Sequence, residues 1–174
     1  MSTTTATATV WASDHQYYVC GEEFDTEGFT YTGFNGLLAP LSPRRGITTP
    51  GSFALLMTGT ELGPVRVTLT QHTAPPPSPD LDAWDDIVEA SLLMPGANPG
   101  ITDAHDSDPL PPLTDTAGAP CRIRAHARGR DRGHQQLIID GEDPLEEHLL
   151  EVWPAPTAPL YTWKTTDAYG ATLR

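Results

Sequence analysis

The chain has 174 residues, 18 of them proline and 15 glycine, and a formal net charge of -13. This length is enough for one domain with a sizeable core, so we expect a single domain over residues 1–174. The acidic balance argues against DNA, RNA and anionic membranes as partners, because each is itself negative, and it is compatible with a basic partner protein.

The N-terminal segment "MSTTTATATVWASDHQYYVC" predicts strands rather than a targeting signal. It lacks a basic start followed by an apolar run, and no window of the sequence has the ~18 apolar residues of a membrane span. Its β-branched and aromatic residues surround a polar break at Ser13 and Asp14, which predicts two strands or one bent strand. We expect a cytoplasmic, bacterial protein in which Cys20 and Cys121 are buried and form no disulfide.

The middle of the chain alternates polar and apolar residues. "SFALLMTGT" (52–60) and "GPVRVTLTQHT" (63–73) predict a hairpin across "ELGP", with one face of the second strand buried. "WDDIVEASLLM" (84–94) has an acidic opening that suits a helix, but its β-branched residues and its length between prolines favour a strand.

Two long loops rich in Pro, Gly and Asp are predicted near residues 74–83 and 95–120. The second contains "DAHDSD", in which Asp103, His105, Asp106 and Asp108 offer ligands to a hard cation such as calcium. The segment lacks EF-hand spacing and an internal glycine, so a hydrated acidic loop is the favoured interpretation and a metal site the alternative.

The segment "CRIRAHARGRDRGH" (121–134) has a basic residue at every even position. Its first odd positions are small and apolar, which predicts a strand whose basic face points to solvent. "GRDRG" is the expected turn and "QLIID" (136–140) the expected return strand. "EEHLLEVWPAP" predicts a further strand, and "LYTWKTT" is expected to end the regular structure.

The basic face is interpreted as a salt-bridged surface. It carries no aromatic side chain other than histidine for stacking on bases, so we expect no nucleic-acid site. Arg122, Arg124 and Arg128 are expected to pair with Glu147 and Glu151 across strands, each exposed pair contributing only ~0.2–1 kcal/mol. A cluster that binds phosphate or another anion is the alternative.

No catalytic arrangement is predicted. His15 follows Asp14 and suits a catalytic relay in principle, but the chain has no G-x-S-x-G elbow, zinc motif or phosphate loop. We therefore expect His15 to be structural, and we expect no catalytic residue, no cofactor and no enzymatic activity.

Short strands separated by loops favour an all-β fold. The specific prediction is a single-domain antiparallel β-sandwich with long Pro/Gly/Asp-rich loops, and a closed barrel is the alternative. The alternation places Val67, Leu69, Ile123 and Trp153 in the core.

The two ends of the chain resemble a known family. "TATVWASDHQYYV" is similar to the first strands of ComJ-like proteins, and "APCRIRAHARG" followed by "EEHLLEVWPAP" resembles their closing strands. Members of that family inhibit a partner nuclease in bacterial competence. The resemblance implies a cytoplasmic nuclease inhibitor or immunity-type protein that presents carboxylates to a basic nuclease or toxin. The alternative function is a calcium-dependent β-sandwich that binds a ligand through its acidic loops.

Overall fold

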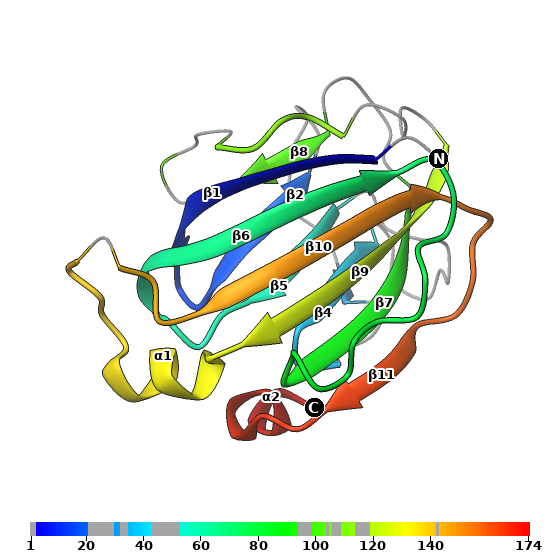
Figure 1. The fold of residues 1–174 in the computed structure, drawn as a ribbon. Helices are drawn as coiled ribbons and strands as arrows, with labels where there is room; N and C mark the ends of the chain where they lie inside the picture. The colour runs from blue at the N-terminus through cyan, green and yellow to red at the C-terminus, as the bar shows by residue number, and fades with distance from the viewer. Residues whose placement is uncertain are drawn as a thin grey trace.

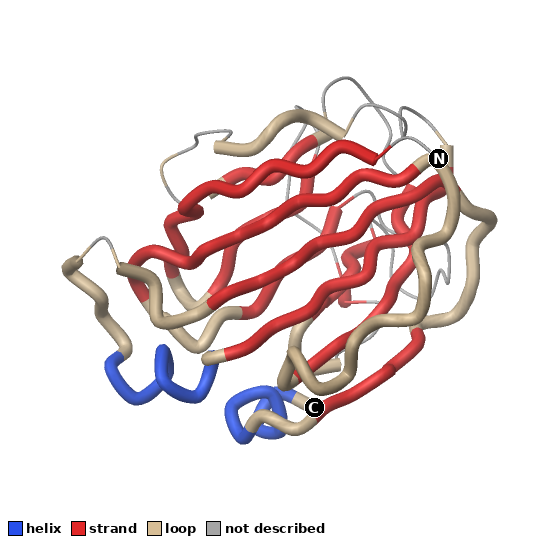
Figure 2. Tube along the Cα trace, in the orientation of Figure 1, coloured by secondary structure: helices blue, strands red, loops and turns tan. Residues whose placement is uncertain are grey.

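The computed structural model describes residues 3–20, 30–31, 35–42, 53–93, 99–103, 105, 109–113, 119–141 and 143–174. The eleven strands of these residues form one mixed sheet that curls into a half-barrel, so the all-β prediction is confirmed (Figure 1). Two short helices lie together at one end of it (Figure 2). Neither helix of the described residues is long and apolar enough to cross a membrane.

Six strands form the near layer of Figure 1, in the order β11-β7-β9-β10-β6-β1. Their bounds are β11 (Tyr161–Thr165), β7 (Asp86–Leu93), β9 (Pro120–Arg128), β10 (Glu147–Pro154), β6 (Leu62–His72) and β1 (Thr3–Ser13). All neighbours in this layer are antiparallel except β10 and β6, which are parallel.

The remaining strands form the far layer. They are β2 (Gln16–Cys20), β5 (Phe53–Met57), β4 (Leu38–Ser42), β3 (Thr30–Tyr31) and β8 (Gly100–Thr102), which pairs with β2. The chain passes from β1 to β2 through Asp14 and His15, both with positive φ, and the two strands pair only at Ser13 and Gln16. The N-terminal segment therefore forms the two strands that the sequence allowed.

The prediction of an antiparallel sandwich is wrong, because the sheet is mixed and continuous. β6, β10 and β7 run in the same direction, as the pairings of β10 with β6 and of β9 with both β10 and β7 require. The chain leaving β6 must therefore recross the length of the sheet before β7 begins. Residues 73–85, here called the proline crossover, make this connection over the outer face of the near layer.

Four further expectations need correction. The predicted hairpin of 52–60 with 63–73 does not form, because β5 pairs with β2 and β4 while β6 pairs with β1 and β10. Residues 136–140 are not a return strand, since α1 (Arg130–Gln136) follows Gly129, whose positive φ ends β9. The expected loop 95–120 contains β8, and β11 is followed by α2 (Ala168–Leu173).

The core lies between the two layers. Val67, Leu69 and Ile123 are buried there, as predicted, together with the small side chains of Ala125 and Ala127. Trp153 is buried too, but it belongs to the outer face of β10, because its strand partner is Arg122.

Arg130 joins the helical end of the fold to both layers. Its side chain is fully buried, and its guanidinium donates to Asp86 at the start of β7 and to Asp167, the N-cap of α2, at 2.8 and 2.6 Å. It also donates to the backbone oxygens of Gly36 and Met57. Asp86 in turn accepts from the backbone N–H groups of residues 166 and 167.

Replacing Arg130 with methionine is expected to destabilise the protein by about 3–5 kcal/mol, because buried Asp167 would lose its counter-charge and buried Asp86 would keep only that of Arg174. Urea unfolding measures the change. Arg132→Met is the control, since Arg132 is exposed and, within the described part of the chain, its side chain donates only to the oxygen of Leu145. Similar losses for both variants would contradict the central place given to Arg130.

Candidate functional site

The basic side of β9 is buried rather than solvated, which corrects the sequence-based prediction. Arg122, Arg124 and His126 are 6, 4 and 2% exposed, whereas the side chain of Arg128 is 47% exposed. Two segments of the chain cover the first three residues. One is the proline crossover and the other is residues 155–160, here called the second cover.

Glu89 on β7 accepts hydrogen bonds from several donors of this face. Its carboxylate accepts from Arg124 Nε at 2.7 Å and from Arg122 Nη2 at 3.2 Å. The indole N–H of Trp163 on β11 donates to the same carboxylate at 2.7 Å. Burial alone would raise the pKa of Glu89, but the hydrogen bonds from Arg124 and Trp163 outweigh it and lower the pKa.

Glu151 on β10 is the second carboxylate that several side chains of this face contact. Its carboxylate lies 3.0 Å from Arg124 Nη1, 3.0 Å from His126 Nε2 and 3.1 Å from His72 Nε2. Burial raises its pKa, and the contacts with His126, Arg124 and His72 more than reverse this, so its pKa lies below the ordinary value. The predicted pairing of Arg124 with Glu151 is present.

The predicted pairing of Arg128 with Glu147 is also present, at 2.6 Å. This pair is partly exposed, and Arg66 reaches the same carboxylate at 3.9 Å. Arg124 and Arg128 therefore have cross-strand partners expected from the sequence, whereas Arg122 pairs with Glu89 instead of Glu147 or Glu151. Of the three arginines, Arg128 alone has the expected solvent exposure.

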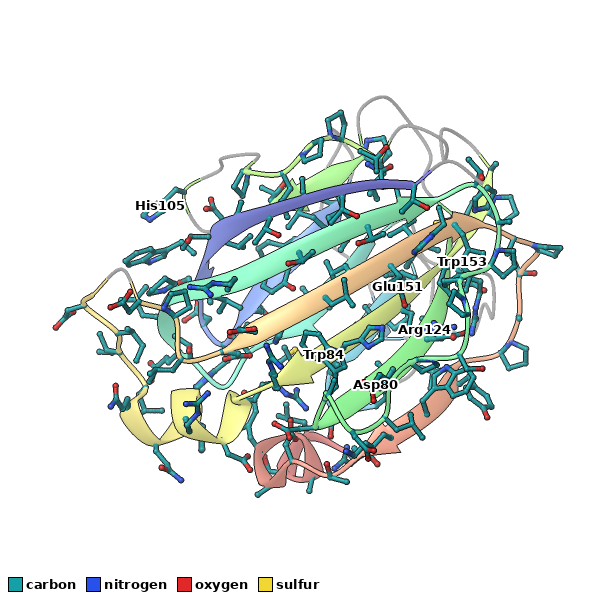
Figure 3. All side chains as sticks on the ribbon, viewed as in Figure 1. Asp80, Trp84, His105, Arg124, Glu151 and Trp153 are labelled. Carbon is teal, nitrogen blue, oxygen red and sulfur yellow. The ribbon has the colours of Figure 1, made fainter. Side chains whose placement is uncertain are left out.

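The same arginines hold the two covering segments on the sheet. Arg122 Nη1 donates to the backbone oxygens of Ala158 and Pro159 and to Ser91 Oγ, each at 3.0 Å. Arg124 Nη1 donates to the oxygen of Pro77 at 2.9 Å. Arg124 also lies between two indole rings, 5.3 Å from the centroid of Trp153 and 5.2 Å from that of Trp163. Figure 3 shows Arg124, Glu151 and Trp153 side by side on the sheet.

An open groove of about 520 Å³ lies beside this network, and we call it the aromatic groove. Its lining is mainly aromatic, proline and alanine side chains over a charged floor: Glu89, Arg122, Trp153, Ala155, Pro156, Ala158, Pro159, Leu160, Tyr161 and Trp163. The groove therefore brings together residues from β7, β9, β10, the second cover and β11. Sequence reasoning missed it, because no local pattern connects these segments.

A second polar cluster, also missed, lies inside the half-barrel. His148 contacts the hydroxyl of Tyr17 through Nδ1 and the carboxylate of Glu146 through Nε2, both at 2.8 Å. All three side chains are buried, and burial together with the charge of Glu146 raises the pKa of Tyr17 well above its ordinary value. Glu146 also accepts from the N–H groups of Gly59 and Thr60. These bonds tie β10 to β2 and to the turn after β5.

His15, Cys20 and Cys121 occupy structural positions in the fold. His15 Nδ1 lies 3.2 and 3.1 Å from the backbone oxygens of Thr58 and Gly59. These contacts stabilise the turn between β1 and β2. Cys20 and Cys121 are buried and form no disulfide, and burial raises the pKa of the Cys121 thiol to about 11.

The predicted cation site is only partly within the described residues. Asp103 is buried and accepts from the backbone N–H groups of Trp11 and His105, at 3.3 and 2.9 Å. Asp106 and Asp108 lie outside the described residues. Among the residues that are described, no group of three or more His, Cys, Asp or Glu is arranged to hold a metal ion. The cation site stays a prediction.

Comparison with known proteins gives little beyond this geometry. No family model matches the chain, and no curated protein matches it. A solved structure similar to the chain is that of the protein named crocagin biosynthetic gene J, with 12% identity and a TM-score of 0.48. The alignment covers 90% of this chain and 100% of that chain. A likeness at this level carries no conclusion about function, and the resemblance to ComJ-like proteins stays a prediction.

Removing the Arg124 side chain is expected to cost about 3–5 kcal/mol of stability, because it leaves Glu89 and Glu151 buried with fewer donors. This exceeds the ~1 kcal/mol ceiling for the exposed pair expected from the sequence. Arg128→Ala, at the exposed end of β9, is the matched control and is expected to stay below that ceiling. Thermal melts with and without phosphate test the anion alternative, which a phosphate-induced stabilisation lost in Arg124→Ala would support instead.

The outer face also predicts a loss of stability in acid. Because the pKa values of Glu89 and Glu151 are lowered by folding, their contribution is complete above the unfolded value of 4.5 and is lost as pH falls through the folded values. Each contributes a slope of up to about 1.4 kcal/mol per pH unit in that range. Urea unfolding between about pH 3 and 7 should show a shallower slope for Glu151→Gln than for the wild type. The exposed Asp140→Asn is the control, and an equal slope in Glu151→Gln would contradict the assignment.

Proposed function

We propose that this protein is a non-catalytic, acidic binding module for a basic partner protein, such as a nuclease inhibitor or an immunity-type protein. The observation that carries the proposal is the use of the cationic side chains. The structure describes eight of the ten Lys and Arg residues, and each of these eight forms an ion pair or donates a hydrogen bond within the fold.

Six of the eight pair with carboxylates and two donate to backbone oxygens. The six are Arg66, Arg122, Arg124, Arg128, Arg130 and Arg174, and the two are Arg132 and Lys164. The surface is therefore left with a surplus of carboxylates, among them the exposed Asp14, Asp80, Asp82, Asp140 and Asp143. Such a surface steers a basic protein toward it and repels nucleic acid.

The buried polar groups support binding rather than catalysis. Glu89 and Glu151 share Arg124 on the outer face, and Glu146 contacts His148 inside the half-barrel. A substrate that used these groups would have to displace structural hydrogen bonds. The aromatic groove, in contrast, is open and mainly apolar, as small binding sites are. Two buried cysteines without a disulfide suit the cytoplasm.

Co-expression with the products of neighbouring genes, followed by capture at low and high salt, tests the proposal. We expect a basic protein to be retained at about 50 mM salt and released at about 500 mM, because exposed charges are screened over that range. A variant carrying Asp80→Asn, Asp82→Asn, Asp140→Asn and Asp143→Asn should retain less of it. Gln135→Asn with Gln136→Asn, two exposed neutral changes, is the control. If no basic protein is retained at low salt, the proposal is wrong.

A further inference from the structure

We propose that the aromatic groove binds an extended, proline-containing segment of the partner that is flanked by lysine or arginine. This inference rests on the proposed function, since it names the surface and the recognition chemistry of the same basic partner.

The groove keeps aromatic and aliphatic surface exposed where the fold does not need it. Tyr161 and Leu160 are 52 and 38% exposed, whereas Trp153 at the floor is only 4% exposed. Tyr161 begins β11, an edge strand whose one neighbour in the described sheet is β7. Proline rings stack on such aromatic faces, and a segment in the polyproline conformation binds aromatic-lined grooves without needing a ladder of hydrogen bonds.

The walls of the groove are fixed before any ligand arrives. Arg122 holds the second cover by its bonds to the oxygens of Ala158 and Pro159. The hydrogen bond to Glu89 sets the orientation of Trp163, and Tyr161 packs edge-on against that ring at 5.0 Å. A rigid groove lowers the ordering cost of binding.

Trp153, at the floor of the groove, has an indole N–H that can donate a hydrogen bond. Among the described residues, no acceptor takes a hydrogen bond from the indole N–H of Trp153, although this side chain is almost fully buried and lines the groove. A backbone carbonyl of an extended segment is the acceptor that suits it, because proline-rich segments have free carbonyl oxygens.

The charged side chains near the groove determine which residues are favoured on either side of the bound partner segment. The proline crossover contacts this face through Pro77, and it carries the exposed carboxylates of Asp80 and Asp82. Two of the nearby cations are neutralised, because Arg122 and Arg124 are paired with Glu89 and Glu151. The single charge of Lys164, whose Nζ donates to the oxygens of Leu81 and Trp84, is outnumbered by the carboxylates of Asp80 and Asp82. Flanking lysine or arginine is therefore favoured over flanking carboxylates.

The test uses three acetylated and amidated peptides titrated into the full chain, with the indole N–H resonances of the four tryptophans as the readout. The probe is Lys-Pro-Pro-Leu-Pro-Lys. One matched peptide has alanine at each proline, and the other has glutamate at each lysine. We expect the probe to shift the Trp153 resonance but not that of Trp11, and both matched peptides to bind at least about fivefold more weakly.

Two groove variants keep the test independent of folding. Tyr161→Ala and Leu160→Ala remove exposed side chains, and each is expected to raise the Kd of the probe by at least about fivefold, as loss of a central contact does. Ile138→Ala, an exposed apolar residue outside the groove lining, is the control and should leave the Kd unchanged.

Several results would overturn the inference. These are equal binding of the three peptides, a shift confined to Trp11, the absence of saturable binding up to about 1 mM probe, or self-association of the chain that Tyr161→Ala abolishes. The proposed function fails separately. If the basic partner is captured equally by the wild type and by Tyr161→Ala, the module binds its partner elsewhere; if no basic protein is captured at all, the proposed function itself is wrong.

Discussion

The Arg130 guanidinium is fully enclosed and cannot lose its charge, so the chain has to bring acceptors to it from several directions. Asp86 comes from the near layer, Asp167 from the cap of α2, and the oxygens of Gly36 and Met57 from the far side. Both layers and the C-terminal helix therefore meet at one side chain. Gly59 and Gly170 lie against Arg130 so closely that an added Cβ would collide with it. This end of the half-barrel closes because one buried charge must be satisfied there.

On the outer face of the near layer, too, several segments of the chain supply counter-charges and acceptors to buried arginines. Two arginines and two glutamates neutralise one another at the centre of the sheet, and the remaining guanidinium donors take backbone oxygens from the two covering segments. Breaking one pair would leave buried charge behind, whereas the pair at the exposed end of β9 can be lost with little effect. The stability lost when an arginine of β9 is removed depends on which segments cover its side chain, and not on its position in the alternating sequence pattern.

Sequence periodicity predicts the strands of this fold well and its tertiary arrangement poorly. The alternation in β9 correctly separates Ile123 and Ala125 from Arg122 and Arg124, and it correctly suggests Glu151 as a partner. It cannot show that the polar side is covered, because the covering residues that bond to Arg122 and Arg124 lie 36 and 47 residues away in sequence. The same limit explains the missed aromatic groove and the false hairpin, since neighbouring strands in sequence are assigned here to different layers.

The proline content of the two covering segments connects the buried charges to the groove. Parallel strands such as β6 and β7 are usually joined by a helix, which would press an apolar face onto the sheet. The sheet beneath is lined with arginine donors, and these require oxygen acceptors. An extended segment rich in proline presents its carbonyl oxygens without a matching set of N–H donors, so Pro77, Ala158 and Pro159 satisfy the arginines directly. Two extended segments cover the face of a sheet less completely than a packed helix does. The space left beside the second cover, with Trp153 and Tyr161 in its lining, is the aromatic groove.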